Sequence, residues 1–341
     1  MRADGGASQG SGHIMRCLTL AEALRSRGHD VELAADIDGV PWLESYVAEC
    51  GFPRVSARAH RIDGDALTAR RPDVVVVDSY RIPAAEISAL AARVPVLAIV
   101  DGDHRGIEAD LYLDQNLGAE DRAWPTTPGT RVLAGAAYAL VRSEIRDARR
   151  DEPWRITGVP RVLALMGGTD ATGGIVLVAA QLASLGSPVD LTVIAGDTHR
   201  DAVSAELSAV PSARVVAPTV RLGELFAEAD IVVSAAGTSS WDICTLGLPA
   251  VMVAVVDNQV ESLRQMVDRG LVLGIDASLD VSAFAGIAPA VERLIADESA
   301  RQQLSRRSVE QFDGRGASRV ADALEQLAAR RTPLTRDTAR P

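Results

Sequence analysis

The chain has 341 residues, which exceeds one small core and fits two domains of roughly 150 residues each. Apolar residues make up 47% and charged residues 24%, which excludes extensive disorder and fibrous repeats. The net charge of −11 disfavours a nucleic-acid partner, because nucleic-acid binders normally carry a basic face. No window of about 18 residues is apolar without a charge, so we expect no membrane span.

The residue types present exclude several chemistries. All 35 basic residues are arginine, so a P-loop lysine and a lysine Schiff base are impossible, which excludes Walker-type nucleotide hydrolases and pyridoxal-phosphate enzymes. Cys17, Cys50 and Cys244 are too scattered for a disulfide framework or a zinc site, and we interpret them as small buried residues. We expect no metal and no cofactor. The first residues carry no apolar leader, so the expected compartment is the cytoplasm.

Helical and strand patterns alternate through the first half of the chain. An amphipathic pattern predicts a helix over residues 14–27, with Gly28 as its C-cap. Near-continuous runs of valine, leucine and isoleucine predict strands over residues 31–35, 74–77 and 94–100. Such runs are typical of parallel strands that are buried on both faces.

A stretch rich in charge, proline and glycine over residues 146–160 predicts a linker, after which the alternation starts again. From residue 281 onward the pattern is helical, and the last ten residues are expected to be frayed. The strands predicted in this half cover residues 162–165, 191–194, 215–216, 231–233 and 250–256, and the helices cover 175–185, 222–229, 239–246 and 259–269.

Two successive β/α modules predict two doubly wound α/β domains that face a cleft. We expect an N-terminal domain over residues 1–150, a nucleotide-binding domain over residues 151–331 and a disordered tail over residues 332–341. Ligands of such folds bind beyond the carboxyl ends of the strands. The glycine-rich loops that open helices are therefore candidate binding sites.

The first such loop is Gly10-Ser11-Gly12-His13, which precedes the predicted helix over residues 14–27. Glycines let backbone N–H groups approach a ligand, and a helix N-terminus favours anions. The helix dipole disfavours the charged form of a histidine in the first turn, and a neutral imidazole is what a general base requires. The alternative is a capping loop in which the histidine merely packs.

Two loops of the second half follow strands and open helices. Residues 166–170, Met-Gly-Gly-Thr-Asp, fit a diphosphate cradle or a plain tight turn. Residues 234–242 offer hydroxyl groups and helix-start amides to phosphate oxygens, and Asp242 could accept from ribose hydroxyls. Ordinary helix capping is the alternative for the second loop, since serine, threonine and aspartate are favoured there.

Three short polar segments also follow predicted strands. Residues 257–259, Asp-Asn-Gln, face the cleft or cap a helix, and residues 78–80 and 101–103 carry carboxylates that could orient a substrate. None of these signals is specific by itself. We interpret the histidines other than His13 as solvated loop residues.

Taken together, the motifs resemble the nucleotide-sugar hydrolase of pseudaminic acid biosynthesis, over about residues 2–275. Asp242 stands where that family usually has glutamate, and residues 101–102 stand where many members carry two acidic residues. The segments that carry the resemblance, in the family's order, are 2–4, 10–17, 78–80, 110–116, 138–142, 166–170, 239–242 and 258–259.

The resemblance implies a GT-B fold, with two Rossmann-like domains facing a cleft, similar to the peptidoglycan N-acetylglucosaminyltransferase. It implies UDP on the C-terminal domain, with Asp242 at the ribose. It implies His13 as the catalytic base, with Asp4 and Tyr80 as further catalytic residues. The residues implied to bind substrate are Gly10, Gly12, Arg16, Asn116, Gly167, Gly168, Thr169, Asp170, Gly237, Thr238, Ser239, Ser240, Asp242, Asn258 and Gln259.

The reaction implied by the resemblance is inverting hydrolysis at C1 of UDP-2,4-diacetamido-2,4,6-trideoxy-β-L-altropyranose or a close relative, which releases UDP and the free sugar. A diphosphate is a good leaving group, so one base and a set of N–H and hydroxyl donors suffice. The alternative is a GT-B glycosyltransferase in which a polysaccharide or secondary-metabolite acceptor replaces water. A non-catalytic nucleotide-sugar binding protein is a third interpretation, against which His13 argues. The expected partner is the UDP-sugar, and the expected state is a monomer or homodimer.

Overall fold

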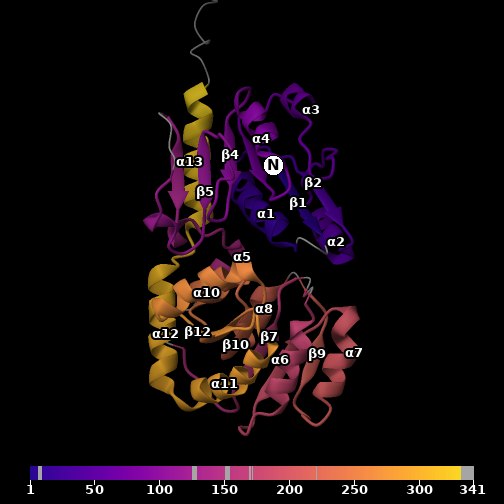
Figure 1. The fold of residues 1–341 in the computed structure, drawn as a ribbon, viewed down its shortest axis with the longest axis vertical. Helices are drawn as coiled ribbons and strands as arrows, with labels where there is room; N and C mark the ends of the chain where they lie inside the picture. Colours follow the sequence, from indigo (N-terminus) through magenta and orange to yellow (C-terminus); the bar gives the residue numbers. More distant parts are fainter. Residues whose placement is uncertain are drawn as a thin grey trace, which may run out of the picture.

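The computed structural model describes residues 1–6, 10–124, 129–149, 154–168, 170, 172–219 and 221–331. Two domains lie end to end along the longest axis of the molecule, each with its own sheet (Figure 1). Thr169, residues 150–153 of the expected linker and the expected tail over residues 332–341 lie outside the described residues.

The N-terminal domain contains a six-stranded parallel sheet in the order β2-β1-β3-β4-β5-β6. Between and beside the strands lie helices and two short 3₁₀ turns, Ala119–Asp121 and Ala136–Tyr138. The strands are β1 (Arg2–Gly6), β2 (Ala34–Asp38), β3 (Val75–Asp78), β4 (Val96–Ile99), β5 (Leu111–Asp114) and β6 (Arg131–Ala134). The helices are α1 (Gly12–Arg25), α2 (Pro41–Glu49), α3 (Gly64–Ala69), α4 (Ala84–Ala91) and α5 (Ser143–Asp147).

The C-terminal domain repeats this plan with the strand order β12-β11-β10-β7-β8-β9, again all parallel. A 3₁₀ turn, Val281–Gly286, precedes its last helices. The strands are β7 (Arg161–Leu165), β8 (Asp190–Ile194), β9 (Arg214–Val216), β10 (Ile231–Ala235), β11 (Ala250–Ala254) and β12 (Leu273–Asp276). The helices are α6 (Gly174–Ala183), α7 (Asp197–Glu206), α8 (Leu222–Glu228), α9 (Ser239–Leu246), α10 (Asp257–Asp268), α11 (Ile287–Ala296), α12 (Glu298–Gln311) and α13 (Gly316–Arg331).

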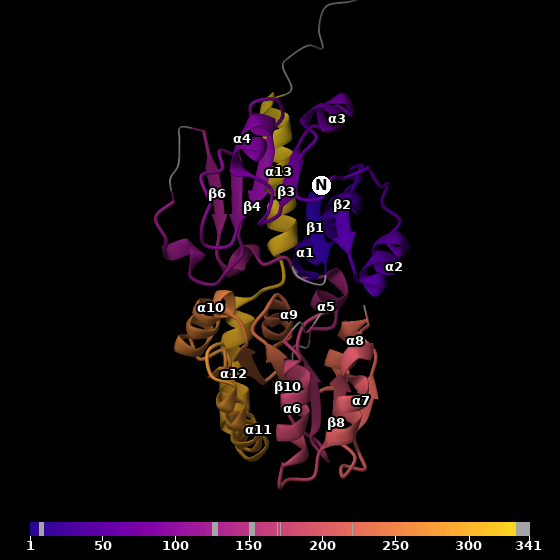
Figure 2. The ribbon, with the colours of Figure 1, turned by 45° about the vertical axis from the view of Figure 1, so that its right-hand side comes forward.

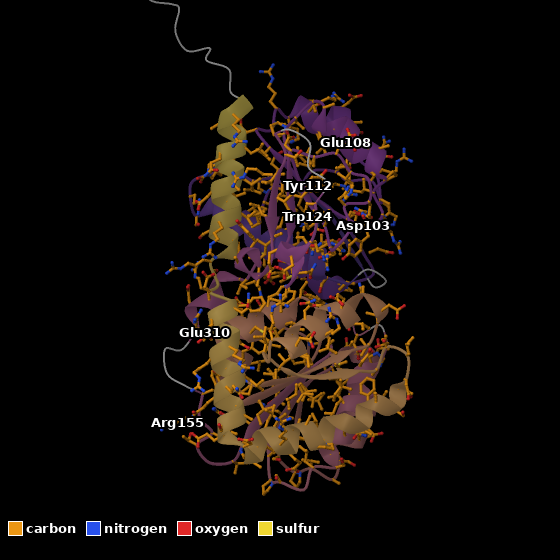
Figure 3. All side chains as sticks on the ribbon, turned by 60° about the vertical axis from the view of Figure 1, so that its left-hand side comes forward. Asp103, Glu108, Tyr112, Trp124, Arg155 and Glu310 are labelled. Atoms are coloured by element: carbon orange, nitrogen blue, oxygen red, sulfur yellow. The ribbon has the colours of Figure 1, made fainter. Side chains whose placement is uncertain are left out.

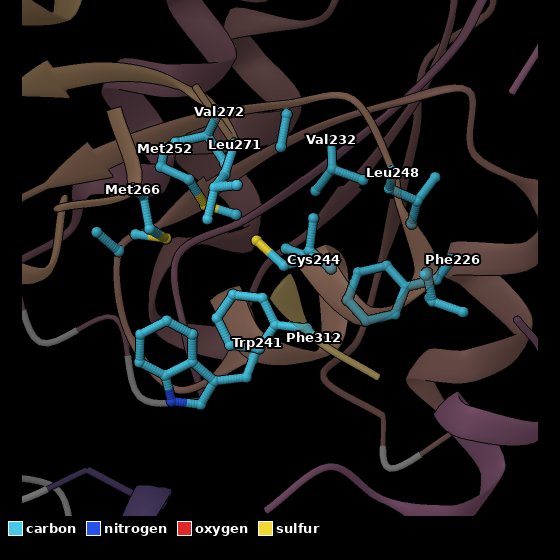
Figure 4. Close-up of a cluster of buried hydrophobic side chains, with 14 of the residues drawn as sticks. Phe226, Val232, Trp241, Cys244, Leu248, Met252, Met266, Leu271, Val272 and Phe312 are labelled. Atoms are coloured by element: carbon cyan, nitrogen blue, oxygen red, sulfur yellow. The ribbon is translucent and has the colours of Figure 1, made fainter. Parts of the chain in front are cut away.

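Each sheet separates two hydrophobic clusters, which explains the continuous apolar runs in the strands. In β3, Val76 joins one cluster while Val75 and Val77 join the cluster on the opposite face. Figure 4 shows one cluster of the C-terminal domain, in which Trp241 stacks on Phe312 with ring centroids 5.2 Å apart. Because side chains alternate across a strand, a strand buried on both faces favours apolar residues at successive positions. The predicted doubly wound α/β class is therefore confirmed.

Strand β1 was not among the strands predicted from apolar runs, because its sequence is Arg-Ala-Asp-Gly-Gly. All five of its residues are buried, and the Arg2 guanidinium forms an ion pair with the Asp4 carboxylate inside the domain. A charged pair that is neutralised in this way can lie in a central strand. Sequence periodicity therefore gave no signal for the strand that precedes the His13 loop.

The expected boundary at residue 151 assigns helix α13 to the C-terminal domain, but the helix packs elsewhere. It crosses back and packs on the N-terminal domain, where Val320 and Leu324 join the cluster that holds α1 (Figures 1 and 3). On the surface of this contact, Arg27 binds Asp322 and His29 binds Glu325. The apolar face of α13 is therefore covered by the first domain, although the helix follows the second in sequence.

The other differences from the predicted elements are local. Strand β2 is shifted by three residues from the predicted range 31–35, and α5 occupies the start of the predicted linker. No ranges were predicted for strands β5, β6 and β12 or for helices α2, α3, α4 and α7. At the edge of the N-terminal sheet, Tyr112 of β5 stacks on Trp124, with centroids 6.4 Å apart (Figure 3). Cys17 and Cys244 are buried as expected, whereas Cys50 is half-buried.

Candidate active site in the interdomain cleft

A cavity of about 980 Å³ lies between the two domains. Loops at the carboxyl ends of both parallel sheets line it, so two walls face each other. This is where ligands bind in doubly wound folds. The volume lies at the upper end of the range of small-molecule sites, about 300–1,000 Å³.

His13, in the first turn of α1, lines the N-terminal wall and is bound from behind by Asp78 at the end of β3. The distance from His13 Nδ1 to Asp78 Oδ1 is 2.6 Å. Burial by itself raises the pKa of Asp78, but the Arg16 and His13 charges and hydrogen bonds outweigh it and lower the pKa. An ionised carboxylate only accepts, so we assign the proton to Nδ1, which leaves Nε2 as the acceptor. This is the arrangement that a general base requires.

Arg16, one turn further along α1, is held by two carboxylates of its own domain, and its Nη2 also lies 3.2 Å from His13 Nδ1. Its Nε and Nη2 donate to Asp78 at 2.5 and 2.7 Å, and its Nη1 and Nη2 donate to Asp101 at 3.0 and 2.9 Å. The side chain lines the cleft but is only 5% exposed. The donors of Arg16 are thus used to position Asp78 and Asp101, and the expectation that Arg16 binds substrate stays a prediction.

Tyr80 follows β3 and stands beside His13 in the cleft. The two rings meet edge to face with centroids 4.5 Å apart, and the Tyr80 hydroxyl donates to Asp101. Partial burial and the Asp101 charge raise the pKa of the Tyr80 phenol, so it stays protonated. The side chain is still 46% exposed, which leaves its ring free to contact a ligand.

Asp101, at the end of β4, joins these residues to Asn116. Asn116 Nδ2 donates to Asp101 Oδ1 and to Asp114 Oδ1, both at 2.8 Å. Burial by itself raises the pKa of Asp101, but the Arg16 charge and the hydrogen bonds from Arg16, Tyr80 and Asn116 lower it strongly. Asn116 lines the cleft as expected, with its amide donors already occupied.

Asp4 does not line the cleft, which corrects the expectation that it acts beside His13. Its carboxylate is fully buried in β1, pairs with Arg2 and accepts from Ser79 Oγ at 2.8 Å. Ser79 Oγ in turn accepts from the backbone N–H groups of Arg81 and Ile82. Asp4 therefore supports the turn that presents Tyr80.

On the C-terminal wall, the loop after β7 brings Gly167 and Gly168 to the cleft. A Cβ atom on Gly168 would lie 2.4 Å from Ser11 Oγ and 2.9 Å from the Trp42 ring, so only glycine fits where the two walls meet. Asp170 also lines the cleft, but its carboxylate accepts from the N–H groups of Gly174 and Ile175. Asp170 thus caps α6, and it is not free to act as a substrate ligand.

Helix α9 points its N-terminus into the cleft. Gly237, Thr238 and Ser239 line the cavity, and a Cβ atom on Gly12 would lie 3.3 Å from Thr238 Cγ2 on the opposite wall. The first N–H groups of a helix have no partner inside it and attract anions. The expectation that Ser240 binds substrate is corrected, because Ser240 is buried and its Oγ contacts Met252 Sδ at 3.8 Å.

Asp242 lies in the first turn of α9 and is bound by Arg142, which precedes α5. Arg142 Nη2 donates to Asp242 Oδ2 at 2.8 Å, and both side chains are buried. Burial raises the pKa of Asp242, and Arg142 only partly offsets this. Helices α5 and α9 pack together at the junction of the domains (Figure 2).

Asn258 and Gln259 line the cleft at the start of α10, as expected. Asn258 is exposed, whereas Gln259 Oε1 accepts from the N–H of Val255 at 2.9 Å. Gly10 and Gly12 also line the cavity. Thr169 lies outside the described residues.

The partners of His13 were missed as functional residues. Asp78 and Asp101 were noted only as strand-end carboxylates, and Arg142 and Trp42 were not singled out as site residues. The available signal was position: carboxyl ends of adjacent parallel strands meet at one edge, so acids after β3 and β4 must lie together. Within the described ranges, no three histidine, cysteine or acidic side chains gather in a way that could hold a metal ion. None of the described helices meets the length and apolarity of a membrane span.

Comparison with known proteins places this geometry in a known architecture. No protein-family model matches the chain. The chain is 21% identical to the spore coat polysaccharide biosynthesis protein SpsG of Bacillus subtilis, over 95% of this chain and 97% of that protein. It is similar to the spinosyn rhamnosyltransferase SpnG, with a TM-score of 0.65, 19% identity and coverage of 95% and 100% of the two chains.

A third similar structure is MurG of Acinetobacter baumannii, with a TM-score of 0.64 at 15% identity over 95% of this chain and 99% of that one. The similarity extends over both domains in each case, and the sheet orders and the cleft agree with it. The chain therefore has the GT-B fold, with two Rossmann-like domains that face a cleft.

Proposed function

We propose that this chain is an inverting glycosyltransferase that uses a nucleotide-sugar donor. One observation carries the proposal: a histidine held by a buried carboxylate faces a helix N-terminus across a narrow cleft. The first group can remove a proton and the second can stabilise a leaving diphosphate. The similar proteins named rhamnosyltransferase and polysaccharide biosynthesis protein support a sugar as the transferred group.

In the proposed reaction, the nucleotide diphosphate lies against the Gly167–Gly168 loop and the N-terminus of α9. An acceptor hydroxyl gives its proton to His13 Nε2 as its oxygen attacks C1 of the sugar. The bond from C1 to the diphosphate oxygen breaks, and its electron pair leaves with the nucleotide. Attack from the side opposite the leaving group inverts the configuration at C1.

Thr238 and Ser239 line the cleft at the start of α9, and we assign their N–H groups to the negative charge that grows on the leaving oxygen. Such fixed donors need no reorganisation during the reaction. Asp242 is assigned to the ribose, with Arg142 holding its carboxylate in place. Tyr80 and Asn258 flank the sugar from opposite walls.

Hydrolysis is the second candidate, because the chain carries the motif order of the nucleotide-sugar hydrolase of pseudaminic acid biosynthesis. The donor site and the base are the same for both reactions, and water replaces the acceptor. The substrate would be UDP-2,4-diacetamido-2,4,6-trideoxy-β-L-altropyranose or a close relative.

Nucleotide release from a panel of UDP- and dTDP-sugars, with and without acceptors, separates the two candidates. Release that requires an acceptor supports the transferase, whereas equal release in water alone supports the hydrolase. His13→Asn should lower turnover about 10²- to 10⁴-fold in either case while leaving nucleotide affinity unchanged. The matched control is His29→Asn, since His29 lies on the surface beside Glu325. A His13→Asn variant with wild-type turnover would refute the assignment of the base.

A further inference from the structure

Among the residues that the structure describes, three arginines line the cleft: Arg16, Arg122 and Arg142. Arg16 is saturated by Asp78 and Asp101, and Arg142 is committed to Asp242. Arg122 differs from both, because it is one-third exposed and its pairing is weaker.

Arg122 makes one long hydrogen bond, from Nη1 to Asp114 Oδ2 at 3.3 Å. Asp114 is already satisfied by three shorter donors, the N–H of Gly102 at 2.8 Å and the N–H and Nδ2 of Asn116 at 3.0 and 2.8 Å. Nε and Nη2 of Arg122 donate to no described residue. An arginine with two donors available can bind a carboxylate or phosphate in a bidentate way.

The absence of a side chain at Gly102 leaves space for the Arg122 guanidinium. A Cβ atom there would lie 2.5 Å from Arg122 Nη1, and the φ of +80° is one that favours glycine. The backbone of Gly102, in the loop after β4, therefore lies directly beside the Arg122 guanidinium. The guanidinium is held in the wall of the cleft, where a side chain at position 102 would displace it.

The strand order shows where Arg122 lies along the N-terminal wall relative to His13. Asp78 ends β3 and Asp114 ends β5, with β4 between them. Strands are spaced by about 4.8 Å, so these two strand ends lie about 10 Å apart along the wall, and Arg122 donates to Asp114. Glu261 of α10 also lines the cleft, and hydrogen bonds from Arg264 and Gln265, together with the charges of Arg264 and Arg122, lower its pKa.

We propose that Arg122 binds a carboxylate or phosphate group of the substrate at the end of β5, two strands along the wall from the carboxylate that holds His13. The substrate class is therefore anionic on the side of the transferred sugar or of the acceptor, in addition to the nucleotide diphosphate. The cleft selects for the anion because Nε and Nη2 of Arg122 offer it two donors. The other two cleft arginines, Arg16 and Arg142, are already paired with carboxylates. This inference rests on the proposed function, which supplies the direction in which the substrate lies.

The test compares the wild type with Arg122→Gln, and with Arg214→Gln as a control that removes a surface arginine near Thr192 and Glu228. Calorimetry gives the Kd of UDP, UDP-glucose and UDP-glucuronate. Nucleotide release then reports inhibition by glucose and by glucose 6-phosphate. In the wild type, we expect the anionic member of one pair to bind more tightly than the neutral one.

Arg122→Gln should lower that preference about 10- to 150-fold, as expected for hydrogen bonds to a charged group, with the Kd of UDP unchanged. Arg122→Lys should restore part of it, and Arg214→Gln should have no effect. A loss in the glucuronate pair assigns the anion to the transferred sugar, and a loss in the phosphate pair assigns it to the acceptor. An unchanged preference in both pairs overturns the inference, as does a weaker UDP affinity alone. If the wild type binds no nucleotide, the proposed function itself fails.

Discussion

At the scale of single residues, the N-terminal wall is a chain of charged groups that neutralise one another. Arg16 lies between Asp78 and Asp101, and the same carboxylates bind His13 and Tyr80. Removing one member of a buried ion pair typically costs about 3–5 kcal/mol, because the other charge is left uncompensated. The network therefore fixes the His13 and Tyr80 rings in the wall of the cleft.

This network should make folding stability sensitive to acid. The folded-state pKa of Asp101 is below its unfolded value, so its contribution is full above about pH 4 and is lost as the pH falls through the folded pKa. Asp101→Asn should lower the free energy of unfolding at pH 7 but should flatten its decline below about pH 4. Urea unfolding at several pH values measures both effects. Asp197→Asn, at a fully exposed position, is the control, and an equally steep decline in both variants would contradict the prediction.

At the scale of elements, α13 ties the end of the chain to the N-terminal domain. Its inner face contributes Val320 and Leu324 to the cluster around α1, and the outer edge adds the Arg27–Asp322 pair. The helix is apolar on one face, and that face must be buried somewhere. In this structure the N-terminal domain covers it.

Leu324→Ala should destabilise the protein by about 2–5 kcal/mol, because Leu324 is only 4% exposed and truncation leaves a cavity. The loss should appear in the N-terminal domain, seen as faster amide exchange in α1 and β1. Arg27→Gln provides the comparison, since an exposed ion pair contributes at most about 1 kcal/mol. If Leu324→Ala loosened only the C-terminal domain, the packing described for α13 would be wrong.

At the scale of the whole molecule, the site exists only because two domains approach each other. One close approach is at Gly168, where Ser11 and Trp42 of the first domain meet the loop after β7. The base lies on one wall and the helix N-terminus on the other, so neither domain alone carries the proposed chemistry. Binding that closes two walls excludes water and brings reacting groups into line.

Gly168→Ala should therefore hold the walls apart. Overpacking of about 1–3 kcal/mol corresponds to nucleotide affinity that is about 5- to 150-fold weaker, with a larger radius of gyration in small-angle scattering. Trp42→Ala in the same chain should restore part of the affinity by removing the obstructing ring. Gly186→Ala is the matched control, because a Cβ atom there meets only a side-chain oxygen at 3.7 Å. Unchanged affinity in Gly168→Ala would show that this contact does not govern binding.

The sequence by itself determined the α/β class, most strands of the second domain and the loops that line the cleft. These follow from local rules: valine-rich runs for buried strands, and glycine-rich turns before helices. The predicted helix over residues 239–246 coincides with α9, and the strand over 162–165 lies within β7. His13, Tyr80, Asn258 and the Gly167–Gly168 loop all reach the cleft, as expected.

Only the tertiary structure decided which charges are available to a ligand. Asp78 is 65 residues from His13, and the pairing depends on β1 and β3 being neighbours, which no local pattern encodes. Arg16 and Asp170 have the residue types of ligand-binding groups, yet Asp78, Asp101 and backbone amides satisfy them first. Arg122 was not identified from the sequence. In the fold it lines the cleft, and its Nε and Nη2 donate to no described residue. Residue type sets what a group can bind, and the folded neighbours determine whether it is already bound.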